Sequence, residues 1–186
     1  MKKLFLMLLC LALVLSGSAL AGEAKENIGK IGVNNQFSLE AKLPEGYKMH
    51  ILSQSDLDLI AMARSEDVTK PDMTLIIAAD DSLDETKRLN DLTEEELKAI
   101  EATFTADYTG EITYMETSYG TKLMVFRETG DDYDFIDFLA YYNGYSIEFI
   151  VTPHYVEGEM QGKALTDEDV ARAIQFLSDL DFVPAA

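Results

Sequence analysis

The sequence of 186 residues contains one cysteine and no tryptophan. The cysteine, Cys10, lies within an apolar run near the N-terminus, and no second cysteine is available to pair with it. A disulfide within the chain is therefore excluded, although disulfides are common in exported proteins of this size. We expect the folded part to be stabilised by the packing of its core.

Positive charge is also scarce. Lys and Arg together number 15 against 34 Asp and Glu, which gives a net charge of −19. Nucleic acids and anionic lipid surfaces both bind proteins through basic patches, so this composition argues against either partner. The excess of acid predicts a solvated acidic surface, with attraction for cations or basic proteins as the alternative.

Motifs for catalysis and for cofactor binding are missing. The only histidines are His50 and His154, and no G-x-S-x-G or H-E-x-x-H motif accompanies them. We interpret both as surface or edge histidines and predict no cofactor and no metal. The acids Asp131, Asp132 and Asp134 lack the spacing of an EF-hand calcium loop, so they are interpreted as exposed acids of a turn. Weak calcium binding there is the alternative.

The N-terminus has the order of a secretion signal. Met1-Lys2-Lys3 is basic, Leu4 to Leu15 is apolar, and Ala19-Leu20-Ala21 matches an A-x-A cleavage site. The apolar run is shorter than the about 20 residues that a membrane-spanning helix needs. We predict a signal peptide over residues 1–21 with cleavage after Ala21, a flexible leader over 22–36, and a secreted, periplasmic or envelope location. Cleavage would leave a chain without cysteine and without a transmembrane segment.

The remaining chain reads as strands interrupted by two helices. Runs that alternate in polarity, or that are apolar throughout, predict strands at residues 37–41, 48–53, 57–63, 73–79, 111–117, 122–127, 133–142 and 145–152. Capped starts with acids in the first turn predict helices over 94–107 and from 167 to about 180. Strands joined by short turns are antiparallel. We therefore predict a single α+β domain over 37–184, with an antiparallel sheet of about six to eight strands and two helices packed on it.

Two local signals are specific enough to predict contacts. Thr93 and Glu96 can form a capping box at the start of the first helix. Asn143-Gly144 between two alternating runs is typical of a type I′ hairpin turn. That turn would place Tyr142 opposite Tyr145 and Phe138 opposite Phe149.

Two short corners of the chain resemble those of a known fold family. Leu43-Pro44-Glu45-Gly46-Tyr47 matches a P-x-G-W/Y corner, and Ile174-Gln175-Phe176-Leu177-Ser178, followed by Asp181-Phe182, is similar to a closing helix with its ending. With the order of elements, these features resemble the PsbP/Mog1-like fold over residues 37–183. The resemblance implies that fold. Members of the family include photosystem subunits, a small-GTPase partner and secreted bacterial proteins, and none of their functional residues can be matched here.

The predicted hairpin has a second, mixed face. We predict that this face is a partner-binding surface, formed by Tyr133, Phe135, Asp137, Tyr141 and Glu148. The predicted function is that of an exported, acidic, non-enzymatic binding or accessory protein, with another envelope or extracellular protein as its partner. The alternatives are a secreted hydrolase, for which Asp137 and Glu148 are the carboxylate pair, a calcium-dependent protein with an acidic site, and a secreted inhibitor or toxin-like effector.

Overall fold

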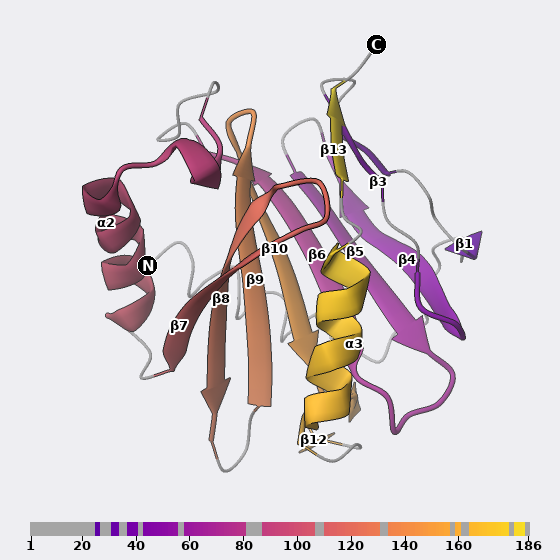
Figure 1. Cartoon of the computed structure of the whole chain (residues 1–186). Helices are drawn as coiled ribbons and strands as arrows, with labels where there is room; N and C mark the ends of the chain where they lie inside the picture. The colour runs from indigo at the N-terminus through magenta and orange to yellow at the C-terminus, as the bar shows by residue number, and fades with distance from the viewer. Residues whose placement is uncertain are drawn as a thin grey trace.

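Eight strands form one antiparallel sheet in this computed structural model (Figure 1). The structure describes residues 25–26, 31–33, 37–40, 43–55, 58–80, 87–106, 110–130, 134–156, 159–160, 164–178 and 181–184. In their order across the sheet, the strands are β1 (Lys25–Glu26), β4 (Tyr47–Gln54), β5 (Asp58–Ser65), β6 (Asp72–Ala79), β10 (Tyr145–Thr152), β9 (Asp134–Tyr142), β8 (Lys122–Thr129) and β7 (Glu111–Glu116). The predicted α+β class with an antiparallel sheet is confirmed.

The remaining elements are short strands and helices. The helices of the described chain are η1 (Leu89–Asp91), α2 (Glu94–Thr105) and α3 (Asp167–Ser178). A second sheet has the order β13 (Asp181–Pro184), β3 (Phe37–Glu40) and β2 (Ile31–Val33), and a third pairs β11 (Tyr155–Val156) with β12 (Glu159–Met160). No helix in the described residues has the length and apolar character needed to cross a lipid bilayer.

Two meanders meet at the centre of the large sheet. β4, β5 and β6 form one meander, β7 to β10 form the other, and β6 pairs with β10 from Tyr145 opposite Ala79 to Thr152 opposite Asp72. Because β6 and β10 are far apart in sequence, this pairing depends on long-range packing and joins the two halves into one sheet.

The hairpin between β9 and β10 has the predicted register. Tyr142 lies opposite Tyr145 and Phe138 opposite Phe149. Asn143 and Gly144 have φ angles of 53° and 78°, the left-handed values that a type I′ turn requires at both positions. The local turn chemistry therefore determines which residues share a face over the whole hairpin.

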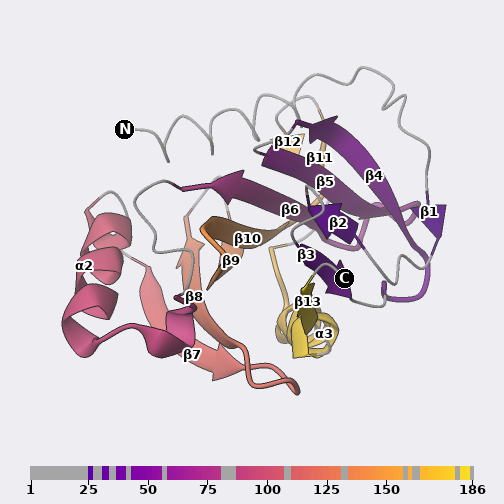
Figure 2. The same cartoon turned by 90° about the horizontal axis from the view of Figure 1, so that it is seen from above.

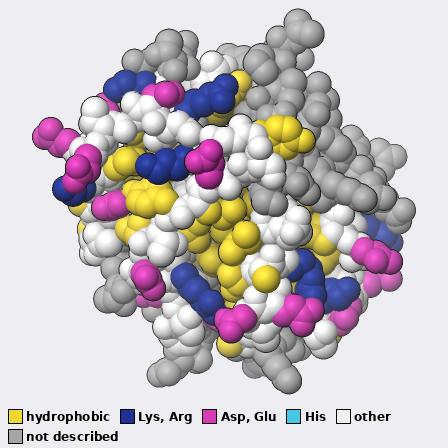
Figure 3. Space-filling model, viewed as in Figure 1, with side chains coloured by type: hydrophobic (Ala, Val, Ile, Leu, Met, Phe, Trp, Pro, Cys, Tyr) yellow, Lys and Arg dark blue, Asp and Glu magenta, His cyan; other side chains and the backbone are white. Residues whose placement is uncertain are grey.

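Apolar clusters cover both faces of the large sheet. The first includes Phe138, Ile147 and Phe149 from the sheet with Phe176 and Leu177 from α3, which lies across that face (Figures 1 and 2). Beside α3, apolar side chains gather among scattered acidic and basic groups (Figure 3). The second cluster occupies the other face, and side chains of η1 and α2 pack against it. The central strands are therefore buried on both faces.

Both helices begin with the predicted caps. The Thr93 backbone N–H donates to Glu96 Oε2 at 2.8 Å, and the Glu96 backbone N–H donates to Thr93 Oγ1 at 3.3 Å. Thr166 and Asp169 repeat the arrangement before α3 at 3.1 and 3.2 Å. These reciprocal bonds satisfy backbone donors that the first turn of a helix leaves open.

The structure departs from the prediction at the two ends of the chain. Within the predicted leader, Lys25–Glu26 is strand β1 beside β4, and Ile31–Val33 is strand β2 beside β3. The ending at Asp181 is strand β13, where Phe182 lies opposite Leu39 of β3. Short strands of this kind are defined by their partners, which the sequence does not indicate. The predicted signal peptide, residues 1–21 with Ala19 and Ala21, lies outside the described residues.

Candidate functional site

The mixed hairpin face predicted as a partner surface is buried. Phe135, Asp137 and Tyr141 are 6%, 5% and 6% exposed, and Glu148 is half-buried. Tyr133 lies outside the described residues. The prediction of an exposed surface is therefore wrong at Phe135, Asp137 and Tyr141. Their strand, β9, lies between β8 and β10, and the second apolar cluster covers this mixed face.

Asp137 and Glu148 lie on this face in the predicted register. Asp137 is opposite Ile150 and Glu148 is opposite Leu139, so the two carboxylates are diagonal neighbours. Burial raises the pKa of the Tyr141 hydroxyl on the same face, and the charges of Glu148, Asp80 and Asp137 raise it further. Tyr141 therefore stays neutral at physiological pH.

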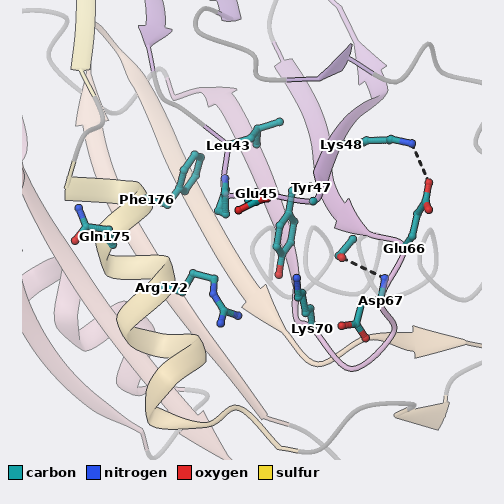
Figure 4. Close-up of a pocket in the computed structure, with 13 residues that line it drawn as sticks. Leu43, Glu45, Tyr47, Lys48, Glu66, Asp67, Lys70, Arg172, Gln175 and Phe176 are labelled. Carbon is teal, nitrogen blue, oxygen red and sulfur yellow. Dashed lines mark hydrogen bonds and ion pairs between the residues drawn. The ribbon is translucent and has the colours of Figure 1, made fainter.

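A pocket lies instead at the turn before β4. It has a volume of about 930 Å³ and is bounded by residues 43–48, by Ser65, Glu66, Asp67 and Lys70 at the turn from β5 to β6, and by Arg172, Gln175 and Phe176 of α3 (Figure 4). We call it the corner pocket. The turn closes through the Tyr47 backbone N–H, which donates to the Pro44 carbonyl at 3.2 Å, and Gly46 has a φ of 84°. The P-x-G-Y corner of the sequence therefore forms one wall.

The inner wall of the corner pocket is apolar. Leu43, Tyr47 and Phe176 are almost fully buried members of the first cluster. The Phe176 ring meets Phe149 edge to face, with ring centroids 6.0 Å apart. This wall belongs to the core, and where it lines the pocket it offers an apolar contact to a ligand.

The rim of the pocket carries opposite charges. Lys48 forms an ion pair with Glu66 at 2.8 Å. Arg172 forms ion pairs with Glu168 at 2.9 Å and with Asp169 at 3.4 Å. Among the described residues, the Lys70 ammonium has no ion pair within 4.0 Å, although it is half-buried. Lys70 is therefore the cation of this rim that is open to a ligand.

Tyr47 places a polar group at the centre of the pocket. Its hydroxyl donates to the Pro71 carbonyl at 2.9 Å. Burial raises the pKa of Tyr47 to about 12, while Arg172 opposes that shift through its charge and a hydrogen bond. Figure 4 shows Arg172 and Lys70 extending toward this hydroxyl from α3 and from the β5–β6 turn. The neutral hydroxyl can therefore accept a hydrogen bond while it donates to Pro71.

A buried ionic group lies next to Pro71. Asp72 is 2% exposed and accepts two hydrogen bonds from Arg64, at 3.1 and 3.0 Å. His154 Nδ1 lies 3.1 Å from Asp72 Oδ2. The interpretation of His154 as a surface histidine is therefore wrong, because the packing of β6 beside β10 brings it to Asp72. His50 is half-buried on β4, where burial and the charges of Arg64 and Lys48 lower its pKa.

The acidic turn has one described member, Asp134. Its carboxylate accepts the Leu165 backbone N–H at 2.7 Å and the Thr129 hydroxyl at 3.1 Å. Asp134 is therefore a buried tie between β9 and the start of α3, and the interpretation as an exposed acid is wrong for this residue. Within the described ranges, no three or more His, Cys, Asp or Glu side chains are grouped so that they could hold a metal ion.

Sequence reasoning did not identify Lys70 or Arg172 as site residues. The P-x-G-Y corner was recognised only as a fold motif, and nothing local indicates that residues 70 and 172 come together beside it. The sequence feature that could have indicated these residues is the small number of Lys and Arg, because a pocket for an anion must draw on those few cations.

Comparisons with known proteins give one similar structure. No family model matches the sequence, and no curated protein matches it. The chain is similar to the solution structure of cyanobacterial PsbP from Synechocystis sp. PCC 6803, with a TM-score of 0.43 and 14% sequence identity over 89% of this chain and 95% of that chain.

Proposed function

We propose that this protein is an exported binding or accessory domain that holds the carboxylate of a ligand or partner in the corner pocket. The observation that carries the proposal is the convergence of Lys70 and Arg172 on the Tyr47 hydroxyl beside an apolar wall. Ligand sites commonly combine an apolar lining with a few polar groups that converge on one point.

Charge supports an anionic ligand at this place. The chain carries 19 more acidic than basic charges, so most of its surface repels anions. The corner pocket gathers Lys48, Lys70 and Arg172 in one concavity with Glu45, Glu66 and Asp67, so its charges balance in a chain that is otherwise strongly acidic. Lys48 and Arg172 already form ion pairs with neighbouring carboxylates, so we expect Lys70 to form the ion pair with the carboxylate of the ligand. Arg172 and the Tyr47 hydroxyl would then orient the bound group.

The apolar wall indicates what the carboxylate should be attached to. Leu43 and Phe176 flank the space next to the cations, so an aliphatic or aromatic body can pack against them. Small aromatic carboxylates and the C-terminal residue of a peptide both have this chemistry. The proposed ligand is therefore an amphiphilic carboxylate, and experiment can distinguish its two sources.

The test is a titration followed by the chemical shifts of backbone amides. Three probes are compared: phenylpropionate, a short peptide that ends in phenylalanine with a free carboxylate, and the same peptide with an amidated end. We expect the carboxylate probes to shift the amides of residues 46–48 and 66–70. If the peptide with a free carboxylate binds more strongly than phenylpropionate, the ligand is the C-terminus of a protein partner. If phenylpropionate binds as strongly as that peptide, the ligand is a small molecule.

Variants separate the pocket from general charge effects. Lys70→Gln should weaken binding by about tenfold or more, because it removes the open ammonium. Lys98→Gln is the matched control, since Lys98 is an exposed cation on α2 that pairs with Glu94 at 2.6 Å. Equal binding of the amidated peptide, or equal loss of affinity in both variants, would overturn the proposal.

A further inference from the structure

β7 is the last strand of the large sheet in the described chain (Figure 1). It runs from Glu111 to Glu116, and four of its six residues are exposed. Among the strands of the described residues, β8 alone pairs with it. An edge strand of this length presents a row of backbone donors and acceptors to another chain.

The register shows which backbone groups face outward. The Thr117 backbone N–H donates to the Thr121 carbonyl at 2.9 Å, next to the ladder in which Met115 is opposite Leu123. Hydrogen-bonded pairs alternate along an antiparallel ladder. The N–H and C=O groups of Ile112, Tyr114 and Glu116 therefore point away from β8. Among the described residues, no backbone bond from another element reaches them.

Side-chain hydrogen bonds fix the turn that follows β7, residues 117–121, in the absence of a partner. The Asn90 side chain donates to the Gly120 carbonyl at 2.8 Å and accepts the Lys122 backbone N–H at 2.9 Å. Thr117 Oγ1 accepts the backbone N–H groups of Tyr119 and Thr121 at 3.3 and 3.2 Å. A preorganised edge loses little conformational freedom on binding.

Aromatic side chains lie along the same edge. Tyr119 is 61% exposed in the turn that follows β7, and Tyr114 is 38% exposed on the strand. Tyr114 is held by its hydroxyl, which donates to Glu101 of α2 at 2.6 Å, and by the Lys122 ammonium 4.5 Å from its ring centre. Fixed, partly exposed tyrosines are frequent anchors at protein interfaces.

Charge decides which strand would pair with this edge. Exposed carboxylates of Glu111 and Glu116 lie at its two ends. Glu111 lies opposite Arg127 and Glu116 opposite Lys122 of β8, but the chain as a whole carries a net charge of −19, so a second copy at this edge would bring two strongly acidic chains together. Repulsion between two acidic chains disfavours a second copy, and the same charge favours a basic strand.

We propose that β7 binds an extended, basic segment of a partner protein by strand addition. The outward backbone groups of Ile112, Tyr114 and Glu116 would form the new ladder. Glu111 and Glu116 would pair with lysine or arginine of the added strand, and Tyr119 would pack against its end. This surface is separate from the corner pocket, and the proposal does not depend on the carboxylate ligand.

Hydrogen exchange gives a direct test. The probe is a short peptide of valine and threonine that carries two lysines five positions apart, so that the lysines lie on opposite faces of the added strand, as Glu111 and Glu116 do on β7. At saturating peptide, exchange of the Ile112, Tyr114 and Glu116 amides should slow by about tenfold or more. The Thr113 and Met115 amides should change little, because the ladder with β8 already holds them. Protection without this alternation, or protection only elsewhere on the chain, would overturn the proposal.

Peptide and protein variants complete the test. A twin with glutamate in place of lysine, and a twin N-methylated at alternate amides, should each bind at least about tenfold more weakly. Glu111→Lys should lose affinity, whereas Glu95→Lys, an equal charge change on an exposed site of α2, should retain most of it. Equal binding of the N-methylated twin, equal effects of the two substitutions, or a dimer through β7 in sedimentation would each contradict strand addition.

Discussion

The Tyr47 hydroxyl donates a hydrogen bond to the Pro71 carbonyl at 2.9 Å, across 24 positions of the chain. Both residues are buried, so the bond closes the inner end of the corner pocket and joins the start of β4 to the start of β6. Arg172 and Lys70 lie around this bonded pair, so the bond holds the Tyr47 hydroxyl in position between the two cations of the proposed binding site.

Tyr47→Phe removes this bond and leaves the Pro71 carbonyl without its donor. The loss of one partner from a buried hydrogen bond costs about 1–2 kcal/mol, so we expect the free energy of unfolding to fall by that amount. Urea denaturation followed by circular dichroism measures it. Tyr119→Phe is the matched control, because the Tyr119 side chain is mostly exposed. Equal stability of Tyr47→Phe and the natural protein would show that the bond contributes nothing net.

Asp72→Asn tests the buried ionic group behind the pocket. The substitution leaves Arg64 and His154 without the carboxylate that both contact. Breaking one side of a buried ion pair costs about 3 kcal/mol or more, so a large fall in the urea midpoint is expected. Glu66→Gln disrupts the exposed pair with Lys48 and should barely move the midpoint. If the urea midpoint fell by a similar amount in both variants, burial of the ion pairs at Asp72 would not account for their contribution to stability.

The cap of α2 should make stability depend on acid pH. Hydrogen bonds from Lys87 and from Thr93 lower the pKa of Glu96 from 4.5 to about 2. Since the folded pKa is the lower one, the stabilisation is complete above pH 4.5 and is lost as the pH falls toward 2. Glu96→Gln keeps a capping amide but loses the charge. The difference in Tm between Glu96→Gln and the natural protein should therefore shrink over that interval.

The neighbouring acid supplies the control for this pH dependence. Glu95 is exposed, and within the described chain it forms none of the bonds that Glu96 makes. Thermal melts of Glu95→Gln at the same pH values should not reproduce the Glu96 profile. If they did, the dependence would arise from general charge repulsion in this acidic chain.

Several features were predictable because their causes are local. The register of the β9–β10 hairpin follows from Asn143 and Gly144, whose backbone adopts the turn whatever lies beside it. The caps follow from contacts three residues apart, between Thr93 and Glu96 and between Thr166 and Asp169. Alternating polarity then indicated the strands, and the short turns between them indicated an antiparallel sheet.

The binding surfaces were not predictable in the same way. The mixed polarity of one face of β9 suggested a partner surface, but burial depends on the strands and helices around β9, so Phe135 and Tyr141 are core residues. The ending at Asp181 to Pro184 becomes a strand only because β3 lies beside it. In both cases a neighbour distant in sequence decides the environment of the residue.

The sequence by itself determined the acidic balance, the lack of a second cysteine, the hairpin register and the helix starts, because each depends on composition or on residues a few positions apart. Only the tertiary structure decided where a ligand can enter. Tyr47, Lys70 and Arg172 form one pocket because the sheet and α3 bring three distant segments together. Long-range packing is cooperative over the whole chain, and no local pattern encodes its outcome.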